Sequence, residues 1–184
     1  MPNQPVIGMS WYEAMAYCAW LHQYCIMHGQ GVTMASEPLN TLLSTGHWQV
    51  RLPTEAEWEK AAGWDADTQQ QRRYAWGDTW DATRANVDNQ VGYPCAVGVF
   101  PAGAAACGAL DMTGNVWEWI LSQYADYPYK SDARNDPAGE ARRVLRGGAW
   151  FDGARFARVS ARSYAPPAYF SYSVGVRVVV APVL

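Results

Sequence analysis

The chain has 184 residues, of which 49% are hydrophobic and only 17% are charged, so its composition excludes a disordered chain. The formal net charge is −3, and no apolar stretch approaches the ~20 residues that a membrane helix needs. The first residues lack the basic and apolar regions of a secretory signal. We therefore expect a soluble protein with a single domain over residues 1–184 and no membrane segment.

The cysteines indicate the compartment. They are Cys18, Cys25, Cys95 and Cys107. They are too few and too scattered for a disulfide scaffold or a CxxC zinc site, so we expect reduced thiols. Reduced thiols favour a cytoplasmic location.

The charge is uneven along the chain. Residues 1–133 carry 6 basic and 14 acidic side chains, whereas residues 134–184 carry 8 basic and 3 acidic ones. The eight late basic residues are all arginines, which can bind nucleic acid or form internal forks to carboxylates and backbone carbonyls. Because there is no tight run beyond Arg142-Arg143, we favour internal forks and expect no nucleic-acid partner.

Two helices carry clear start and stop signals. The first begins at a capping box of Ser10 with Glu13, continues with apolar residues at helical spacing, and ends before Gly29. The second begins at a capping box on Thr54 and ends at Gly63.

The rest of the chain shows little regular periodicity. Residues 32–50 are predicted to be an insertion or long loop, and residues 64–108 a packed loop region with its own ligands or ions. Short strands are predicted at 116–121, 144–150 and 174–180. The sequence therefore predicts an α+β domain with two helices, short antiparallel strands and much ordered loop.

Several segments are recognisable by their sequence and their order. They are 5–14 (PVIGMSWYEA), 51–59 (RLPTEAEWE), 74–78 (YAWGD), 111–119 (DMTGNVWEW), 146–150 (RGGAW) and 175–177 (GVR). Together they resemble the formylglycine-generating enzyme (sulfatase-modifying factor) family, and the resemblance implies a C-type-lectin-like fold. The first strands usual in that family are missing before residue 5, which implies a shortened chain.

The resemblance also allows the family's chemistry to be checked. Its active enzymes oxidise a substrate cysteine with copper held by two cysteine thiolates, which suit Cu(I). The corresponding positions here are Asp152 and Ala157, and no cysteine follows Cys107. A related iron-dependent branch needs three histidines from an additional helical domain, which this chain lacks. We therefore expect no copper, no catalytic residue and no enzyme activity, with a copper-dependent or other oxidase as the alternative.

The resemblance implies structural Ca²⁺ at the segment 111–119. The ligands would be the side chains of Asp111 and Glu118 with the carbonyls of Gly114 and Val116, a hard-oxygen set. A second family site would involve Asn86. In the alternative, Asp111 and Glu118 only accept hydrogen bonds from backbone or arginine.

The segment 151–173 has an unusual composition. It lacks Lys, Glu, Gln, Met, Trp and Leu, and its non-framework positions hold residues reachable from the codon AAC by changing the first two bases. This pattern resembles the variable proteins of diversity-generating retroelements, many of which are similar to the same family. We expect residues 144–184 to be the variable region and the partner to be a variable target, a protein or another macromolecule. The alternatives are chance composition, an ordinary binding surface, or a generic regulatory or nucleic-acid-binding domain.

The predicted ligand-binding residues should share one solvent-facing patch. They are Phe151, Asp152, Gly153, Phe156, Ser160, Tyr164, Ala165, Pro166, Ala168, Tyr169, Phe170, Tyr172 and Ser173. Its aromatic anchors are expected to be Tyr164, Tyr169, Phe170 and Tyr172, because aromatic side chains dominate interface energetics. A fixed framework should hold the loop by charge-assisted hydrogen bonds. The framework residues are Arg155, Arg158, Arg162, Pro167, Gly175 and Arg177.

Overall fold

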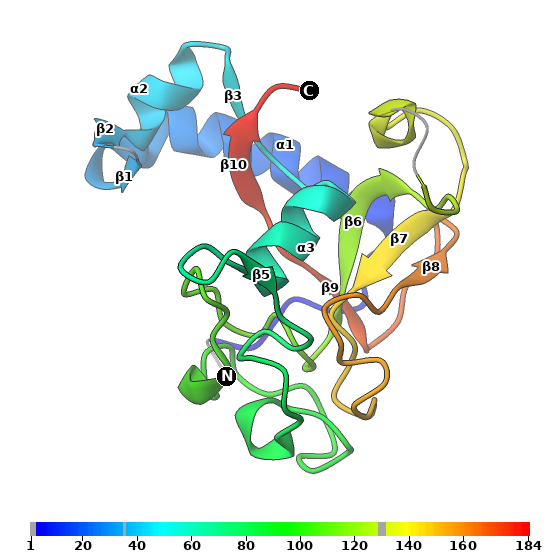
Figure 1. Ribbon diagram of the computed structural model, residues 1–184. Helices are drawn as coiled ribbons and strands as arrows, with labels where there is room; N and C mark the ends of the chain where they lie inside the picture. The colour runs from blue at the N-terminus through cyan, green and yellow to red at the C-terminus, as the bar shows by residue number, and fades with distance from the viewer. Residues whose placement is uncertain (1–2, 35, 129–131) are drawn as a thin grey trace.

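A four-stranded sheet with the order β8-β7-β6-β9 forms the centre of the molecule (Figure 1). The computed structural model describes residues 3–34, 36–128 and 132–184. The strands of this sheet are β6 (Trp117–Gln123), β7 (Arg143–Arg146), β8 (Ser163–Ala165) and β9 (Val174–Val176). β7 runs antiparallel to β6 and β8, whereas β9 runs parallel to β6.

Helix α1 (Trp11–His28) covers one face of the sheet. Its start is the predicted capping box, with Ser10 accepting from Glu13 N and Glu13 accepting from Ser10 N. The helix buries Trp11, Ala14 and Cys18 in one cluster with Trp119 of β6. Four-residue and seven-residue spacings place these side chains on one helical face.

Helix α3 (Glu55–Gly63) contributes to a second cluster. Its capping box on Thr54 is also confirmed. Trp58 and Ala62 pack in a cluster with Ile120, the residue next to Trp119. Because successive strand residues point to opposite faces, β6 contributes to a separate core on each side of the sheet.

A second, two-stranded sheet pairs β3 (Trp48–Arg51) with β10 (Val179–Pro182) in antiparallel register. Helix α2 (Leu39–Ser44) packs beside it, burying Leu39 and Leu43 against Val50. The segment 32–50 is thus not a loop, because it also holds the short pair β1 (Thr33–Met34) and β2 (Glu37–Pro38). A helix of six residues is too short to show a period in the sequence, so two helices were expected where the described residues form three α-helices.

The strand expected over 116–121 is β6 (Trp117–Gln123), and the other two predicted strands differ more in their bounds. The strand expected over 144–150 ends at Arg146, because Gly147 and Gly148 adopt φ of 97° and 79°. The strand expected over 174–180 divides into β9 and β10, which join different sheets. The parallel pairing of β9 also differs from the expected antiparallel core, while the α+β, C-type-lectin-like class is confirmed.

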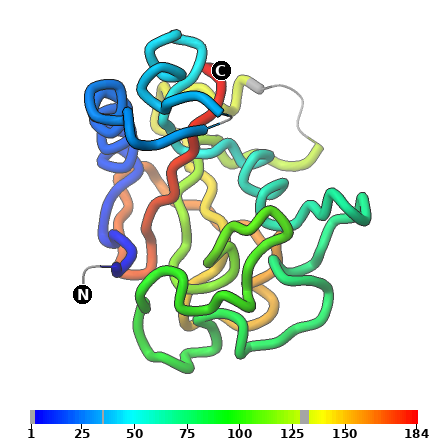
Figure 2. Tube along the Cα trace, turned by 90° about the vertical axis from the view of Figure 1, so that its left-hand side faces the viewer, coloured from blue at the N-terminus to red at the C-terminus, as the bar shows by residue number. Residues whose placement is uncertain are grey.

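Most of residues 64–116 fold as ordered loops, drawn in green at the lower side of Figure 2. Ion pairs fix them locally, as Arg72 does with Asp65 at 2.7 Å. The remaining short elements are β4 (Trp64–Asp65), β5 (Gln70–Gln71) and the 3₁₀ helices η1 (Gly29–Gly31), η2 (Ala82–Arg84), η3 (Pro101–Gly103) and η4 (Asp132–Asn135). Among the described residues, none of the helices is long and apolar enough to span a membrane.

Candidate functional site

The C-terminal segment, residues 147–173, connects β7 to β9 through the edge strand β8. It leaves β7 at two glycines, and a Cβ on Gly148 would lie 3.0 Å from the carbonyl oxygen of Phe156. The backbone therefore closes tightly on itself at this point, and only glycine combines that contact with a positive φ. The segment is an ordered loop held at both ends by the sheet.

Most residues predicted to contact a target are exposed. Phe170 and Tyr172 expose 68% and 65% of their surface, and Tyr164 and Tyr169 expose 43% and 45%. Exposed aromatic groups of this size are typical of interaction surfaces. The exposed members of the predicted set are Phe151, Phe156, Ser160, Tyr164, Pro166, Ala168, Tyr169, Phe170 and Tyr172.

Four predicted residues do not belong to this surface. Ala165 and Ser173 are buried, because Ala165 lies in β8 and the carbonyl of Ser173 accepts a hydrogen bond from Trp117 N at 2.8 Å. Asp152 and Gly153 are half-buried. The prediction of one patch with all thirteen residues is therefore wrong for these positions.

Three of the exposed aromatic residues, Phe151, Tyr164 and Tyr172, belong to two groups of neighbouring rings. In the Trp150 group, the ring of Trp150 lies 5.0 Å from Phe151 and 6.4 Å from Tyr172. In the Tyr164 group, the rings of Tyr164 and Tyr124 lie 4.4 Å apart. Each group extends the exposed segment with a residue outside the predicted set.

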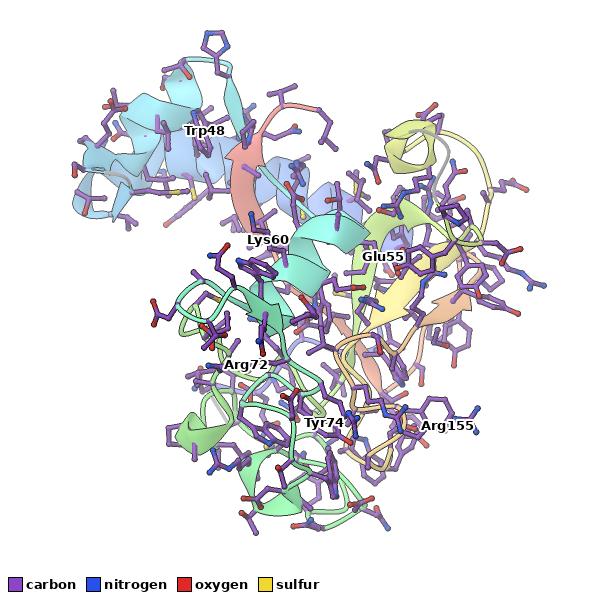
Figure 3. All side chains as sticks on the ribbon, in the orientation of Figure 1. Trp48, Glu55, Lys60, Arg72, Tyr74 and Arg155 are labelled. Atoms are coloured by element: carbon purple, nitrogen blue, oxygen red, sulfur yellow. The ribbon has the colours of Figure 1, made fainter. Side chains whose placement is uncertain are left out.

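The base of the segment is held by Glu55, the first residue of α3 (Figure 3). Its carboxylate is 1% exposed and accepts hydrogen bonds from Arg162 Nε at 2.6 Å and Arg134 Nη1 at 3.1 Å, while Arg146 Nη1 lies 3.7 Å away. From the sequence, Glu55 is expected only to be a helix-start carboxylate. The contact with Arg162 joins residues 107 positions apart, so no local pattern reveals it.

The arginines predicted to form internal forks do so only in part. Arg143 is fully buried and donates to several backbone carbonyls, and Arg177 forms a fork to Glu118. Arg155 and Arg158 are exposed, and among the described residues neither has an ion-pair partner. The charge-assisted hydrogen bonds expected of these two residues are therefore not found in the described part of the chain, and the guanidinium of Arg155 lies instead over the ring of Phe156, 5.5 Å from its centroid.

Asp152 and Ala157 occupy the positions of the family's copper thiolates. Asp152 Oδ2 accepts hydrogen bonds from Trp117 Nε1 and Ala149 N, each at 2.9 Å, and Ala157 is buried. Burial raises the pKa of Asp152 above its ordinary value, and the two hydrogen bonds oppose that rise. Through these hydrogen bonds, Asp152 anchors the turn that follows β7 to Trp117 of β6.

We expect Asp152→Asn to be increasingly more stable than the wild type as the pH rises. Because the folded protein raises this pKa, it binds the proton more tightly than the unfolded chain does. Wild-type stability therefore falls as the pH rises from about 3.9 through the folded pKa. Asparagine keeps an acceptor oxygen without this titration. Urea denaturation of both proteins between acidic and neutral pH measures the difference, and a difference that did not change with pH would contradict the expectation.

The four predicted calcium ligands line one cavity of about 450 Å³. They are Asp111, Gly114, Val116 and Glu118. However, Glu118 accepts from Arg177 Nε at 3.0 Å and from Trp58 Nε1 at 2.7 Å. Because a guanidinium lies against its carboxylate, the structure favours the alternative that Glu118 is a hydrogen-bond acceptor.

Two other oxygens fit a cation better. Asp111 accepts from Gly98 N at 2.7 Å, and burial is the main cause that raises the pKa of Asp111. Asn86 is 1% exposed, and its Oδ1 has no hydrogen-bond partner in the described part of the chain. Within those same residues, no three His, Cys, Asp or Glu side chains are grouped to hold a metal. The predicted donor set is thus present only in part.

We expect millimolar calcium to leave the melting temperature unchanged relative to magnesium. The reason is that Arg177 already neutralises Glu118, which leaves one acidic ligand in the predicted set. Thermal unfolding with each ion measures the effect, since a ligand that binds only the folded state stabilises it. A calcium-specific rise that disappears in Asp111→Asn would overturn this expectation and support the implied site.

The mixed sheet between two helices, with much of the chain in ordered loops, defines the C-type-lectin-like class of the formylglycine-generating enzymes. The chain belongs to the family described as "Sulfatase-modifying factor enzyme 1-like domain", which matches residues 1–182.

Relatives of the chain include named enzymes. Hercynine oxygenase of Mycolicibacterium thermoresistibile is 36% identical over 186 residues, covering 96% of this chain and 36% of that protein. Formylglycine-generating enzyme of Streptomyces coelicolor is 30% identical over 194 residues, covering 96% of this chain and 52% of that protein. The chain thus spans only about a third to a half of the length of these curated relatives.

Among solved structures, Treponema denticola variable protein 1 has the same fold, with a TM-score of 0.72 at 24% identity. The match covers 96% of this chain and 70% of that chain. At this level of identity the likeness shows the fold alone.

The relatives correct one sequence-based conclusion. The prediction that the protein is not an enzyme is wrong, because relatives matching almost the whole chain are named hercynine oxygenase and formylglycine-generating enzyme. The missing thiolates at positions 152 and 157 argue only against one copper site. This chain matches only 36% of the length of the oxygenase. The missing thiolates therefore give no information on catalytic groups in the remaining part of such a protein.

Proposed function

We propose that residues 144–184 form a variable surface that binds a protein or another macromolecular target. The observation that carries the proposal is the exposure of aromatic side chains on a segment that the sheet holds at both ends. Phe170 and Tyr172 are the most exposed of them. A protein named variable protein 1 has the same fold, so the fold is compatible with this role.

The framework of the segment suits such a surface. Arg162 is tied to Glu55, and Asp152 is tied to Trp117, so the backbone is fixed by residues that do not face solvent. Exposed residues can then change without altering the loop. Tyr and Phe provide large contact area at low conformational cost, and small residues such as Ser160 and Ala168 allow close approach. These contacts also support residues 1–184 as one domain, since α3, β6 and the C-terminal segment are joined.

We expect the combined replacement of Tyr164, Tyr169, Phe170 and Tyr172 by Ser to abolish target binding. Because all four are exposed, the free energy of unfolding should change by less than about 2 kcal/mol. Target binding is measured by capture and mass spectrometry, and stability by urea denaturation. A large loss of stability would show that these side chains belong to the core, contrary to the proposal.

The encoding locus tests the diversification directly. We expect a near-copy of the DNA for residues 144–184, with adenines at the variable positions, beside a reverse transcriptase gene. If the locus had neither the near-copy nor the reverse transcriptase gene, the proposed variable role would be wrong and the segment would be an ordinary binding surface.

A second candidate function is oxidation. The observation that favours it is the 36% identity to hercynine oxygenase over 96% of the chain. We would measure oxygen consumption with hercynine, using the full-length protein because the chain spans about a third of that relative. Turnover would support oxygenase activity, and no consumption above the protein-free rate would exclude hercynine as a substrate.

A further inference from the structure

A cavity of about 540 Å³ lies where the C-terminal segment meets the loop after β5. The two parts are joined by a hydrogen bond from Val159 N to Arg73 O at 2.9 Å. Its lining includes the charged and hydroxyl side chains of Arg72, Arg73, Arg158, Glu59, Asp78 and Ser160. The sequence alone does not reveal this cavity, because its arginines come from separate segments.

Some of the charges in this lining are already paired. Arg72 binds Asp65 at 2.7 Å, and Glu59 binds the buried Arg146. Arg73 and Arg158, in contrast, are exposed, and no carboxylate of the described residues lies within ion-pair distance of either. The cavity therefore presents two guanidinium groups whose charge is not neutralised by a direct contact.

We propose that Arg73 and Arg158 bind a carboxylate group of an acidic segment in the protein target. Guanidinium groups bind carboxylates through paired, charge-assisted hydrogen bonds, and Ser160 supplies a hydroxyl beside them. The inference rests on the proposed function. It specifies that the segment of the target that binds here carries acidic groups next to apolar ones. The aromatic side chains of the same C-terminal segment, such as Phe156, would contact the apolar part.

The same lining disfavours nucleic acid. Glu59 and Asp78 lie at the cavity, and Asp78 Oδ1 accepts a hydrogen bond from Arg73 N at 2.8 Å. A rigid duplex cannot bring one phosphate to the arginines without bringing its neighbours close to these carboxylates, whereas a flexible peptide can place a single carboxylate there. The chain as a whole is also acidic, with a net charge of −3.

The test is a titration of the ¹⁵N-labelled protein followed by NMR. The probes are a blocked oligoglutamate peptide, the matching oligoglutamine peptide, inorganic phosphate and a DNA duplex. We expect oligoglutamate to shift the amide signals of Arg73, Val159 and Ser160, and oligoglutamine to leave them unchanged. In the double variant Arg73→Gln, Arg158→Gln the Kd should rise at least about tenfold.

Arg155→Gln is the matched control, because Arg155 is an exposed arginine of the same segment that extends away from the molecule (Figure 3) and is not part of the cavity lining. It should leave the Kd within about twofold of the wild type, as expected for a surface substitution. The proposal is overturned if oligoglutamate shifts none of the three signals, or if the double variant binds as the wild type does. It is also overturned if phosphate or the duplex binds more tightly than the peptide.

These outcomes are separate from the test of the proposed function. The aromatic variant reports on target binding, and the peptide titration reports on the arginine cavity alone. Loss of target binding in the aromatic variant with no peptide binding would reject only the cavity.

Discussion

Replacing Glu55 by Ala should lower the free energy of unfolding by about 3–5 kcal/mol, because removing one partner of a buried ion pair leaves uncompensated charge. The carboxylate is 1% exposed and accepts from Arg134 and Arg162, with Arg146 close by. Its loss would remove this carboxylate from Arg134 and Arg162, while Arg146 would keep its ion pair with Glu59. Urea denaturation measures the change.

Glu140→Ala is the matched control, since Glu140 is exposed. It should change the free energy of unfolding by no more than about 0.5 kcal/mol. If the two variants were equally stable, Glu55 would not hold the arginines. The conclusion that Glu55 fixes the base of the C-terminal segment would then be wrong.

Trp119→Ala should cost about 3–5 kcal/mol of stability, the range for truncation of a buried aromatic residue. Trp119 is 0% exposed on β6, packs beneath α1, and donates from Nε1 to the carbonyl of Met9 at 3.0 Å. The variant would open a cavity and leave that carbonyl without its donor. Thermal or urea unfolding gives the loss.

The same substitution at Trp20 separates burial from residue type. Trp20 lies on the outer face of α1, is 57% exposed and stacks on Tyr24 at 5.3 Å. We expect Trp20→Ala to cost less than about 1 kcal/mol. A comparable loss at both positions would mean that the outer face of α1 is packed against something in solution.

Local signals made the two long helices predictable. Each begins at a capping box, and a capping box needs only residues three positions apart, such as Ser10 and Glu13. The family motifs then indicated the fold class, because they occur in order along most of the chain. The exposed aromatic residues of the C-terminal segment were also predictable, since their composition suits a contact surface.

Long-range pairing was not predictable in the same way. Ala165 and Ser173 are buried because of hydrogen-bond partners in distant strands, and the division of the last strand depends on two different sheets. The arginine cavity combines Arg73 with Arg158, which are far apart in the sequence. A single sequence contains no information on such pairs beyond the residue types themselves.

The pairing of β3 with β10 has a consequence for synthesis. Val50 lies opposite Val180, so β3 cannot find its partner until another 130 residues have been made. Contacts between such distant residues require the closure of a long loop and slow the folding reaction. Until β10 has been made, the apolar side chains around Leu43 lack the strand that completes their sheet. This region of the nascent chain is therefore open to aggregation or chaperone binding until then.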